Sequence, residues 1–574
     1  MTGAPAGGPT AGAATAPTSR DLRELAARAR RQLVRAWLAI PLPEPWRGLA
    51  LVLAVHWVAL LLFTLSVHHN GWLFYQGGDQ IWYWTAGWLL PAGDITEPLI
   101  TQGWALVMAP ATLVAGPGFV SGLPYTVLLQ ALVLAPIALW AVYEIAARIG
   151  GRPIGYVAAL LWTLGPYLAI PAFDQRYHEK YVEQFLPHPL GLTLMPDYVS
   201  TVLLIVTAAF ALRAIAERDP RAAILAGLVA GFAATIKPSS MLILPPLVAV
   251  LVLWGRWREL LAFAAAVAPG VGAFTLWKYQ GYGYLPALLD AAPATHLAAG
   301  DDLISEAYDK YIGIDWTHLH DNILGLRENF FSIRVLEFLP VAGAIAVARR
   351  SLAAACLLVF WFALFFVMRG AHEVSSMDSG SFWRFQLPTV PALVVLAAAL
   401  PTLIPRVGTL LAERYPRPRT PRLRWRTLAV AAAFLALVPL VSAAVVTPLT
   451  EPDRTVQLDE IAIPVSSDLA ARTAVAGGEV RLTWDRWSSS AARVFYRLVR
   501  AEGATDVFCL AHANGADECE LTGAVVLATR RTALRDRPGP GTWTYRVGVA
   551  ANYLDALDVG DVFLVGPPVT VTLP

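Results

Sequence analysis

Long apolar runs separated by short polar connections fill most of the chain up to residue 448. A helix needs roughly 20 apolar residues to cross the hydrocarbon core of a bilayer. Runs near this length recur along the chain, although several are shorter. The pattern predicts a polytopic α-helical membrane protein with about eleven transmembrane helices. They lie near residues 49–67, 123–145, 154–171, 198–216, 222–238, 241–254, 259–277, 336–348, 352–368, 387–404 and 427–447.

Basic residues are concentrated in alternate connections between these runs, at 20–47, 148–152, 213–221, 256–258, 349–350 and 406–426. Cytoplasmic loops of membrane proteins are enriched in Lys and Arg, so these connections and the N-terminus are expected in the cytoplasm. No Lys or Arg stands between Arg47 and Arg148, which predicts that the long connection 68–122 lies outside. An odd number of crossings then puts the C-terminus outside as well.

Four connections are expected on the outer side, at 68–122, 172–197, 278–335 and 369–386. The first contains a further apolar stretch, Leu99 to Val120, that is interrupted by Gly and Pro. We interpret this stretch as a helix at the membrane interface, with a re-entrant segment as the alternative. Most polar residues of the transmembrane region gather in these outer loops, so any chemistry is expected there.

After Pro448 the apolar runs become short and alternating, with turn residues between them. Alternation with a period of two is typical of β-strands, and the pattern resembles a fibronectin type III or related immunoglobulin-like sandwich. Trp484 is expected in its core, and Tyr545 is a candidate for the corner tyrosine of such folds. The predicted domains are a disordered, basic cytoplasmic segment (1–48), a transmembrane domain (49–448) and an extracytoplasmic β-sandwich (449–574).

Composition supports the membrane class. Hydrophobic residues make up 56% of the chain, above the 45–50% that is usual for soluble domains. The net charge of +2 does not indicate binding to nucleic acid. Abundant Ala and Arg with few Lys indicates a GC-rich bacterial source, so we expect a bacterial plasma membrane.

The chain contains three cysteines. Cys356 stands inside an apolar run and is expected to be a packing residue. Cys509 and Cys519 flank a short polar segment near the C-terminus, which favours a disulfide in an oxidising, extracytoplasmic compartment. Two unpaired thiols are the alternative. The redox argument agrees with the topology that the basic residues predict.

Ionisable residues at the outer membrane face are the candidates for chemistry, because charge near hydrocarbon is costly and tends to be functional. Asp79 follows two glycines and begins an aromatic-rich apolar segment; a helix N-cap is the alternative reading of this residue. Cations are scarce on this face. Lys237 and Arg384 stand at helix ends, where anchoring of the helices at the interface is one explanation.

Further candidates for binding an acceptor or a sugar lie in the first, second and fourth outer loops. Asp197 begins a transmembrane segment, so helix capping is again an alternative. A charged, solvated helix face would equally explain His178 and Glu179. No spacing here is diagnostic of zinc or calcium, so a divalent metal is not indicated, and the cofactor stays open. The candidates are Gln80, Asp174, His178, Glu179, Asp197 and His372.

Three segments in this order resemble the GT-C superfamily of membrane glycosyltransferases. GGDQIWYWTAGWLL is similar to the start of the family's first outer loop. MPDYVSTVLLIVTAAFALRAIAERDPRAAILAGLVAGFAATIKPSS resembles the middle section, where an Asp begins one helix and Lys-Pro ends the next. FWRFQLPTVPALVVLAAAL looks like the late helix start with Arg, an aromatic residue and Pro. The likeness covers roughly residues 49–404.

This resemblance implies transfer of a sugar from a polyprenyl-phosphate donor on the outer face, with inversion at the anomeric carbon. Asp79 matches the acidic residue that serves as general base, since an acceptor hydroxyl needs its proton removed as the anomeric bond breaks. Many members carry a second acid beside it, where this chain has Gln80. Lys237 and Arg384 match positions that bind the donor phosphate. The acceptor is expected to be a glycan, a lipid or a protein.

Two other classes of function fit the same helices. A secondary transporter or flippase of cell-envelope precursors would suit the helix count, but no duplicated half is visible and the polar residues do not gather at mid-membrane. A membrane anchor that displays the β-domain would need no acidic residue, so its function would survive loss of Asp79. We expect a glycosyltransferase.

Overall fold

The computed structural model describes most of the chain. The described residues are 42–66, 79–95, 101–176, 186–282, 314–330, 337–372, 374–417, 423–448, 454–458, 461–487, 494–503, 525–529, 531–551 and 562–574, with residues 28 and 32. Residues 1–48 and 49–574 form two separate units, and the site lies entirely in the second. Cys509 and Cys519 fall outside the described residues, so their predicted disulfide stays a prediction.

Eight helices among the described residues are long and apolar enough to cross a membrane. The fold class predicted from the sequence is thereby confirmed, and the chain is a multi-pass membrane protein. The eight are α2 (Pro45–Ser66), α5–α6 (Phe119–Gly150), α7 with the turn after it (Arg152–Ala172), α10 (Asp197–Glu217), α13 (Trp257–Tyr282), α17 (Leu352–Gly370), α18–α19 (Ser381–Leu403) and α21–α22 (Trp425–Val445).

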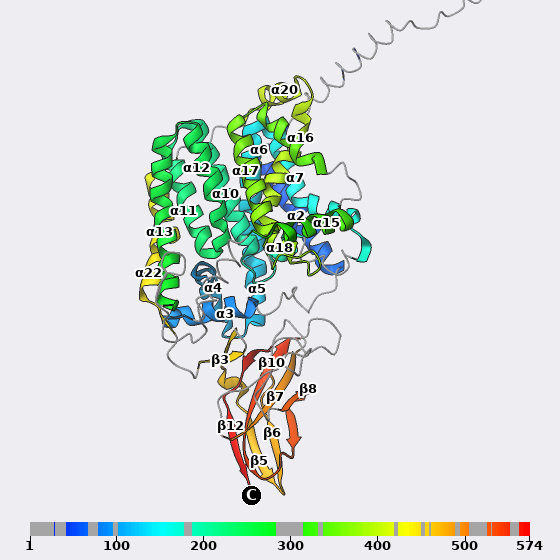
Figure 1. The fold of residues 1–574 in the computed structure, drawn as a ribbon, viewed down its shortest axis with the longest axis vertical. Helices are drawn as coiled ribbons and strands as arrows, with labels where there is room; N and C mark the ends of the chain where they lie inside the picture. The colour runs from blue at the N-terminus through cyan, green and yellow to red at the C-terminus, as the bar shows by residue number, and fades with distance from the viewer. Residues whose placement is uncertain are drawn as a thin grey trace, which may run out of the picture. The chain divides into compact units, whose positions relative to one another are not determined.

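The other three predicted spans coincide with shorter apolar helices: α11 (Pro220–Ile236), the segment Pro238–Leu253 that contains α12 (Leu244–Leu253), and α16 (Leu339–Ala348). At a rise of 1.5 Å per residue, the ten residues of α16 measure about 15 Å, half the thickness of a hydrocarbon core. These helices stand alongside the long ones (Figure 1). Whether they also cross the bilayer stays a prediction.

Small residues let helices α11 and α13 approach closely. α11 buries a run of Ala and Gly residues, and Gly231 of α11 faces Gly270 of α13. A Cβ atom at Gly270 would overlap the backbone of Gly231, whereas one at Gly272 would meet open space. In a bilayer, where hydrophobic association between helices is weak, such close backbone contact is a main source of packing energy.

Short helices collect at the end of the bundle next to the strands (Figure 1). The predicted loop 68–122 contains α3 (Asp79–Leu89), α4 (Gln102–Ala115) and the beginning of α5. α4 lies within the stretch expected to be an interface helix. It buries Trp104 and Met108 on one side, and Leu113 is 73% exposed on the other.

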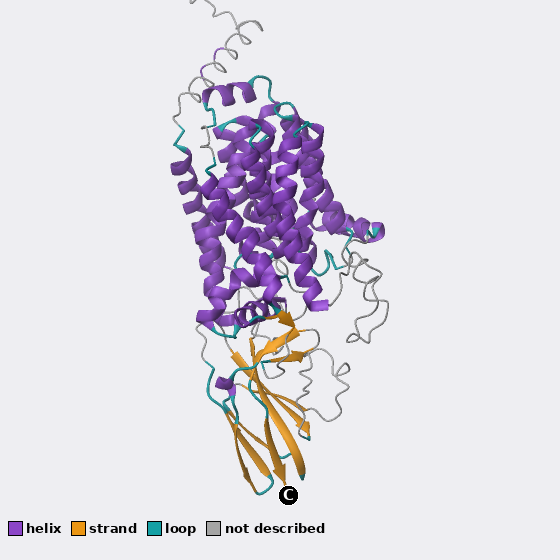
Figure 2. Cartoon of the chain, turned by 90° about the vertical axis from the view of Figure 1, so that its left-hand side faces the viewer, coloured by secondary structure: helices purple, strands orange, loops and turns teal. Residues whose placement is uncertain are grey.

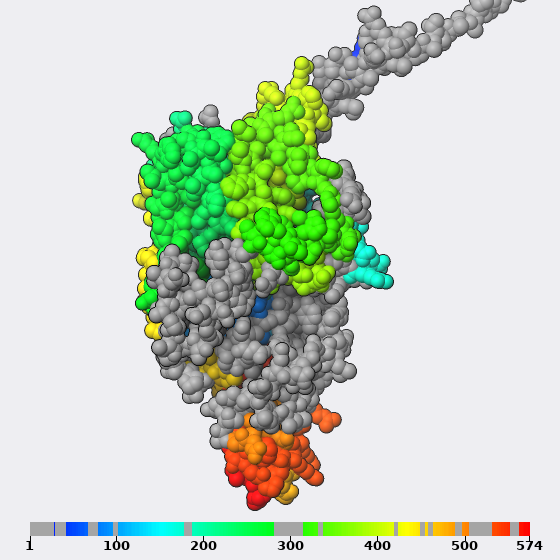
Figure 3. Space-filling view, viewed as in Figure 1, coloured from blue at the N-terminus to red at the C-terminus, as the bar shows by residue number. Residues whose placement is uncertain are grey.

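Helix α15 (Trp316–Asn329) lies on the surface of the bundle (Figure 3). Its Asp315 cap accepts hydrogen bonds from the backbone N–H groups of Thr317 and His318. On its inner side the buried Asn322 donates to the carbonyl oxygens of Gly370 and Ser375, at 2.9 and 2.6 Å. The helix therefore holds the segment between α17 and α18, which carries candidate site residues.

A second group of paired charges lies at the C-terminal ends of α6 (Ala135–Gly150) and α10. Its arginines are expected on the cytoplasmic side, and they are paired with acidic residues. Arg148 contacts Glu144 and Glu217 at 3.0 Å each. Arg417 contacts the same two carboxylates, at 3.2 and 3.0 Å. Burial of these charges is tolerable because each has partners of opposite sign, and the network joins α6, α10 and the chain after α20 (Val407–Arg414).

The C-terminal strands form two main antiparallel sheets (Figure 2). Trp484 is buried and its ring lies 5.5 Å from that of Tyr496, so the expected core tryptophan is in place. One sheet has the order β11-β10-β7-β8 with β12 beside β10; the other has the order β5-β6-β9. The strands are β5 (Arg472–Ala476), β6 (Glu479–Thr483), β7 (Val494–Glu502), β8 (Val525–Thr529), β9 (Ala533–Asp536), β10 (Gly541–Ala551), β11 (Val562–Val565) and β12 (Val569–Leu573).

Tyr545 lies within β10 and is fully buried. Its hydroxyl donates to the carboxylate of Asp536 at 2.8 Å, and Arg500 contacts the same oxygen at 2.7 Å. A corner tyrosine would donate to a backbone group, so this tyrosine differs from that motif while keeping a structural role. Burial and the neighbouring carboxylate raise the pKa of Tyr545 well above its usual value.

The strand region is fastened to the short helices. β1 (Asp94–Ile95), which follows α3, pairs in parallel with β2 (Thr447–Pro448) after α22 (Val438–Val445). Arg454 contacts Asp94 at 2.8 Å, and the ring of Phe563 lies 5.0 Å from that of Phe119 at the start of α5. The β-domain therefore contacts the same part of the chain that carries α3.

We expect Gly270→Val to lower the free energy of unfolding by roughly 1–3 kcal/mol, because the new side chain must push α13 away from α11. Gly272→Val, two residues along the same helix, is the matched control and should change stability by less than about 1 kcal/mol. Thermal unfolding in detergent measures both. Equal effects of the two substitutions would contradict the close contact.

We expect Tyr545→Phe to destabilise the β-domain by about 1–2 kcal/mol, through loss of a hydrogen bond to a charged acceptor. The folded state holds the tyrosine proton more tightly than the unfolded state, so this contribution is complete below about pH 10 and is lost as the pH rises further. Limited proteolysis of the full chain at rising pH should show a steeper loss of protection in the wild type than in the Phe variant. Identical pH profiles would argue against this role.

Candidate active site

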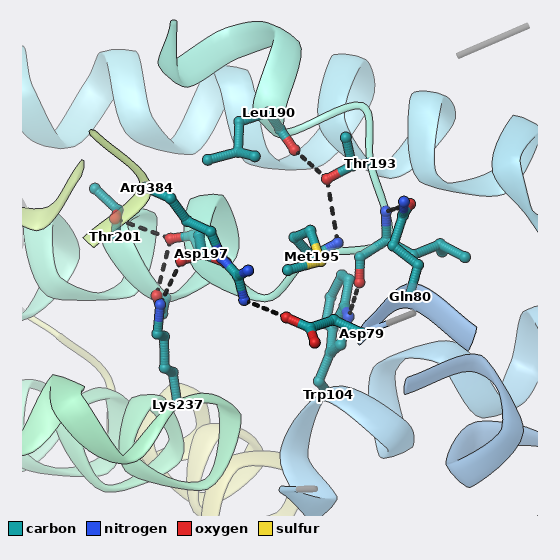
Figure 4. A network of polar contacts seen from close by, with 12 residues as sticks. Asp79, Gln80, Trp104, Leu190, Thr193, Met195, Asp197, Thr201, Lys237 and Arg384 are labelled. Atoms are coloured by element: carbon teal, nitrogen blue, oxygen red, sulfur yellow. Dashed lines mark hydrogen bonds and ion pairs between the residues drawn. The ribbon is translucent and has the colours of Figure 1, made fainter. Parts of the chain in front are cut away.

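Four helix ends meet at one place, and each contributes one charged side chain (Figure 4). Asp79 is the first residue of α3, and Asp197 is the first residue of α10. Lys237 follows the last residue of α11, and Arg384 stands in the short helix α18 (Ser381–Gln386). These residues are separated by 40 to 305 positions along the chain, so only the tertiary fold unites them.

Local sequence accounts for three of these four helix ends. α11 stops at Lys237 because the next residue is Pro238, and a residue before proline disfavours the helical conformation; Lys237 is extended, with φ −150° and ψ 117°. Asp197 and Asp79 lie in the first turn of their helices, where a negative charge is favoured by the helix dipole. These local features place Lys237, Asp197 and Asp79 at the ends of their helices.

Arg384 joins the two carboxylates. Its Nη2 atom lies 2.7 Å from Oδ2 of Asp79, and its Nε atom lies 3.1 Å from Oδ2 of Asp197. The planar guanidinium can serve two acceptors at fixed angles. One cation therefore links α18 to α3 and α10 together.

Lys237 occupies the other oxygen of Asp197: its Nζ atom donates to Oδ1. The Asp197 side chain is 1% exposed, whereas that of Asp79 is 41% exposed. Asp197 is thus a buried counter-ion held between two cations, and Asp79 is the accessible carboxylate. The capping alternative does not describe Asp197, because its α10 has no side-chain cap hydrogen bond.

A third cation and an aromatic ring complete the cluster. The guanidinium carbon of Arg369, near the end of α17, lies 4.4 Å from the ring centroid of Phe385. The same ring lies 5.4 Å from Nζ of Lys237 and 5.9 Å from the guanidinium carbon of Arg384. Cations are attracted to an aromatic face at such distances. The sequence reasoning missed Arg369, although an arginine that ends an apolar helix is a usable signal.

Four of the other predicted residues divide into three groups. His372 reaches the edge of the cluster, where its ring stacks on Phe385 with centroids 5.5 Å apart. Asp174 lies elsewhere in its loop: its carboxylate accepts from the backbone N–H of Arg176, and its own N–H donates to Asn329. His178 and Glu179 lie outside the described residues.

Gln80 is fully buried and supports the site from behind. Its Oε1 atom accepts from the backbone N–H of Leu194 at 2.9 Å. Trp104 of α4 donates to the carbonyl oxygen of the same Leu194 at 2.6 Å. In addition, Thr101 donates to the carbonyl of Ile236, next to Lys237, at 2.6 Å. These bonds fix α3 and α4 against the chain that leads into α10 and against the end of α11.

The described residues contain no group of three or more His, Cys, Asp or Glu side chains arranged to hold a metal ion. Each oxygen of Asp197 already has a cationic partner. The arrangement places an accessible carboxylate, Asp79, beside a set of cations.

The known proteins to which the chain is similar share only a small part of its sequence. No protein-family model and no curated protein matches the chain. It is similar to the solved structure of ArnT from Cupriavidus metallidurans bound to undecaprenyl phosphate, with a TM-score of 0.42 and 16% identity, over 70% of this chain and 72% of that chain. The apo structure of ArnT gives a TM-score of 0.39 at 16% identity, over 70% and 74%.

The chain is also similar to the oligosaccharyltransferase of Archaeoglobus fulgidus in the apo form. The TM-score is 0.39 at 13% identity, over 70% of this chain and 56% of that chain. This chain therefore spans little more than half the length of the archaeal structure.

We expect Asp197→Asn to destabilise the fold by about 3–5 kcal/mol, because it leaves two cations at a buried position without their counter-ion. Adding Lys237→Met removes one of these cations and should restore part of the loss. Thermal unfolding of the single and double variants tests this. A single variant as stable as the wild type would show that Asp197 is not the counter-ion that holds the cluster.

Proposed function

We propose that the chain is a membrane glycosyltransferase that transfers a sugar from a polyprenyl-phosphate donor to an acceptor hydroxyl on the outer face of the membrane. The observation that carries this proposal is the accessible carboxylate of Asp79 beside the cations Lys237 and Arg384, which the buried Asp197 holds together. The order of the GT-C-like segments in the sequence supports the same assignment.

The cations suit the leaving group. When the bond between the anomeric carbon and the phosphate oxygen breaks, negative charge develops on the phosphate. Lys237 and Arg384 would stabilise this charge, and Arg369 would add a third positive charge at the Phe385 ring. Preorganised cations in a site with little water are more effective than the same charges in solution.

Asp79 suits the role of general base. The acceptor hydroxyl is a poor nucleophile until a carboxylate within hydrogen-bond reach takes its proton. The acceptor oxygen then forms its bond to the anomeric carbon as the polyprenyl phosphate leaves, and the proton ends on Asp79. Attack from the side opposite the phosphate inverts the anomeric centre. Gln80 is buried against Leu194, so it would position α3 without touching the substrate.

The test is to incubate the purified, reconstituted chain with a panel of polyprenyl-phosphate sugars and candidate acceptors, and to measure release of polyprenyl phosphate and of transferred sugar. Turnover of any donor supports the proposal. If no donor in a broad panel reacts or binds, the proposal fails, and a transporter or an anchor for the β-domain becomes the better reading.

We expect Asp79→Asn to lower the rate of sugar transfer by about 10²–10⁴-fold, the usual contribution of a general base, while the protein stays folded. Asp94→Asn is the matched control: Asp94 stands in the same connection and pairs with another arginine, Arg454, away from the site. Its transfer rate should be close to that of the wild type. Full activity of Asp79→Asn would exclude Asp79 as the base.

A further inference from the structure

We propose that the ion pair between Arg384 and Asp79 is a lock that the donor opens: the donor phosphate takes the place of Asp79 on Arg384, and the released carboxylate can then act as base. This inference rests on the proposed function and adds how that site is regulated. It is drawn from the contacts of one guanidinium group with two unlike carboxylates.

The two partners of Arg384 differ in how firmly they are held. Asp197 is 1% exposed, and its second oxygen is occupied by Lys237. Asp79 is 41% exposed, and Arg384 is the one ion-pair partner found for it among the described residues. Breaking the buried contact would strand a charge, which is costly; breaking the exposed contact returns Asp79 to water. Asp197 is thus the lasting partner, and Asp79 is the exchangeable one.

The contact with Arg384 opposes the proposed role of Asp79. Oδ2 of Asp79 accepts a hydrogen bond from Nη2 of Arg384 at 2.7 Å. While this bond lasts, Oδ2 is engaged with Arg384 and the Asp79 side chain is held toward α18. Asp79 must leave Arg384, at least in part, before Oδ2 can reach the hydroxyl of an acceptor.

A phosphate has the chemistry to cause this exchange. It offers several strong acceptor oxygens, and arginine binds phosphate through two parallel hydrogen bonds. With Nε of Arg384 held by Asp197 at 3.1 Å, the edge that carries Nη2 is the part that the phosphate can take from Asp79. Lys237 and Arg369 add attraction for the same anion around Phe385. The base is then released only when a donor is present, so the donor binds before the acceptor is activated.

The test measures the affinity of the full chain, in lipid nanodiscs, for undecaprenyl phosphate as probe. If Asp79 competes with the phosphate for Arg384, then Asp79→Asn should bind the probe more tightly than the wild type, by roughly five-fold, the upper range for an exposed ion pair. Arg384→Ala should bind it at least about ten-fold more weakly, through loss of a hydrogen bond to a charged group. Asp94→Asn, with the same change in charge, should bind as the wild type does.

The double variant separates exchange from simple repulsion between Asp79 and the phosphate. In the exchange, Asp79→Asn gains nothing when Arg384 is absent, so Asp79→Asn/Arg384→Ala should match Arg384→Ala alone. If Arg384→Ala does not fold, Arg384→Lys replaces it: a lysine keeps the charge but lacks the fork that serves two acceptors, so the gain from Asp79→Asn should again shrink.

The outcomes have distinct meanings. If Asp79→Asn binds undecaprenyl phosphate as the wild type does, or more weakly, the lock is overturned. The donor site is still supported in that case, provided that Arg384→Ala weakens binding. The same gain in the presence and absence of Arg384 also overturns it, because repulsion alone would explain the gain. If neither the wild type nor Asp79→Asn binds the probe, the proposed donor site fails, and the lock fails with it.

Discussion

The buried carboxylate of Asp197 is the constraint on which the rest of the site depends. A lone charge at 1% exposure would be prohibitively costly, so Lys237 and Arg384 must lie against it. Because the three residues belong to α10, the end of α11 and α18, their mutual attraction determines how these helix ends meet. The helices bring the charges together, and the charges in turn determine the packing at this end of the bundle.

Asp79 depends on a different part of the structure. α3 is held from behind through Gln80 and Leu194, and from the side by Trp84, whose indole packs on Gly122 of α5 and donates to the carbonyl of Gly116. Through the ring contact of Phe563 with Phe119 at the start of α5, the β-domain also holds the helix on which Trp84 packs. A domain that lacks candidate chemistry of its own therefore contributes to the position of the candidate base.

The long helices and the β-strands could be predicted from the sequence, because local patterns of apolar residues encode them. Apolar length revealed the long helices, and alternation revealed the strands around Trp484 and Tyr545. The short helix α16 shows the limit, since ten apolar residues between connections look like a span whatever their final depth. Local sequence patterns could not predict which charged residues pair with one another. Asp79 and Arg384 stand 305 positions apart, and only the order of family-like segments suggested that they share a site. Arg369 was missed because no such segment contains it.

Pairing also argues against the capping reading of Asp197 and the anchoring reading of Lys237. A capping aspartate would bond to its own helix and a snorkelling lysine would turn to the interface, yet Asp197 and Lys237 bond to one another. Such compensation makes these charges tolerable next to hydrocarbon, and it keeps the cations assembled at one place. Under the proposed function, a donor phosphate would need to displace only the more exposed carboxylate, Asp79. The pairing that stabilises the cluster would then also hold the candidate base until a donor binds.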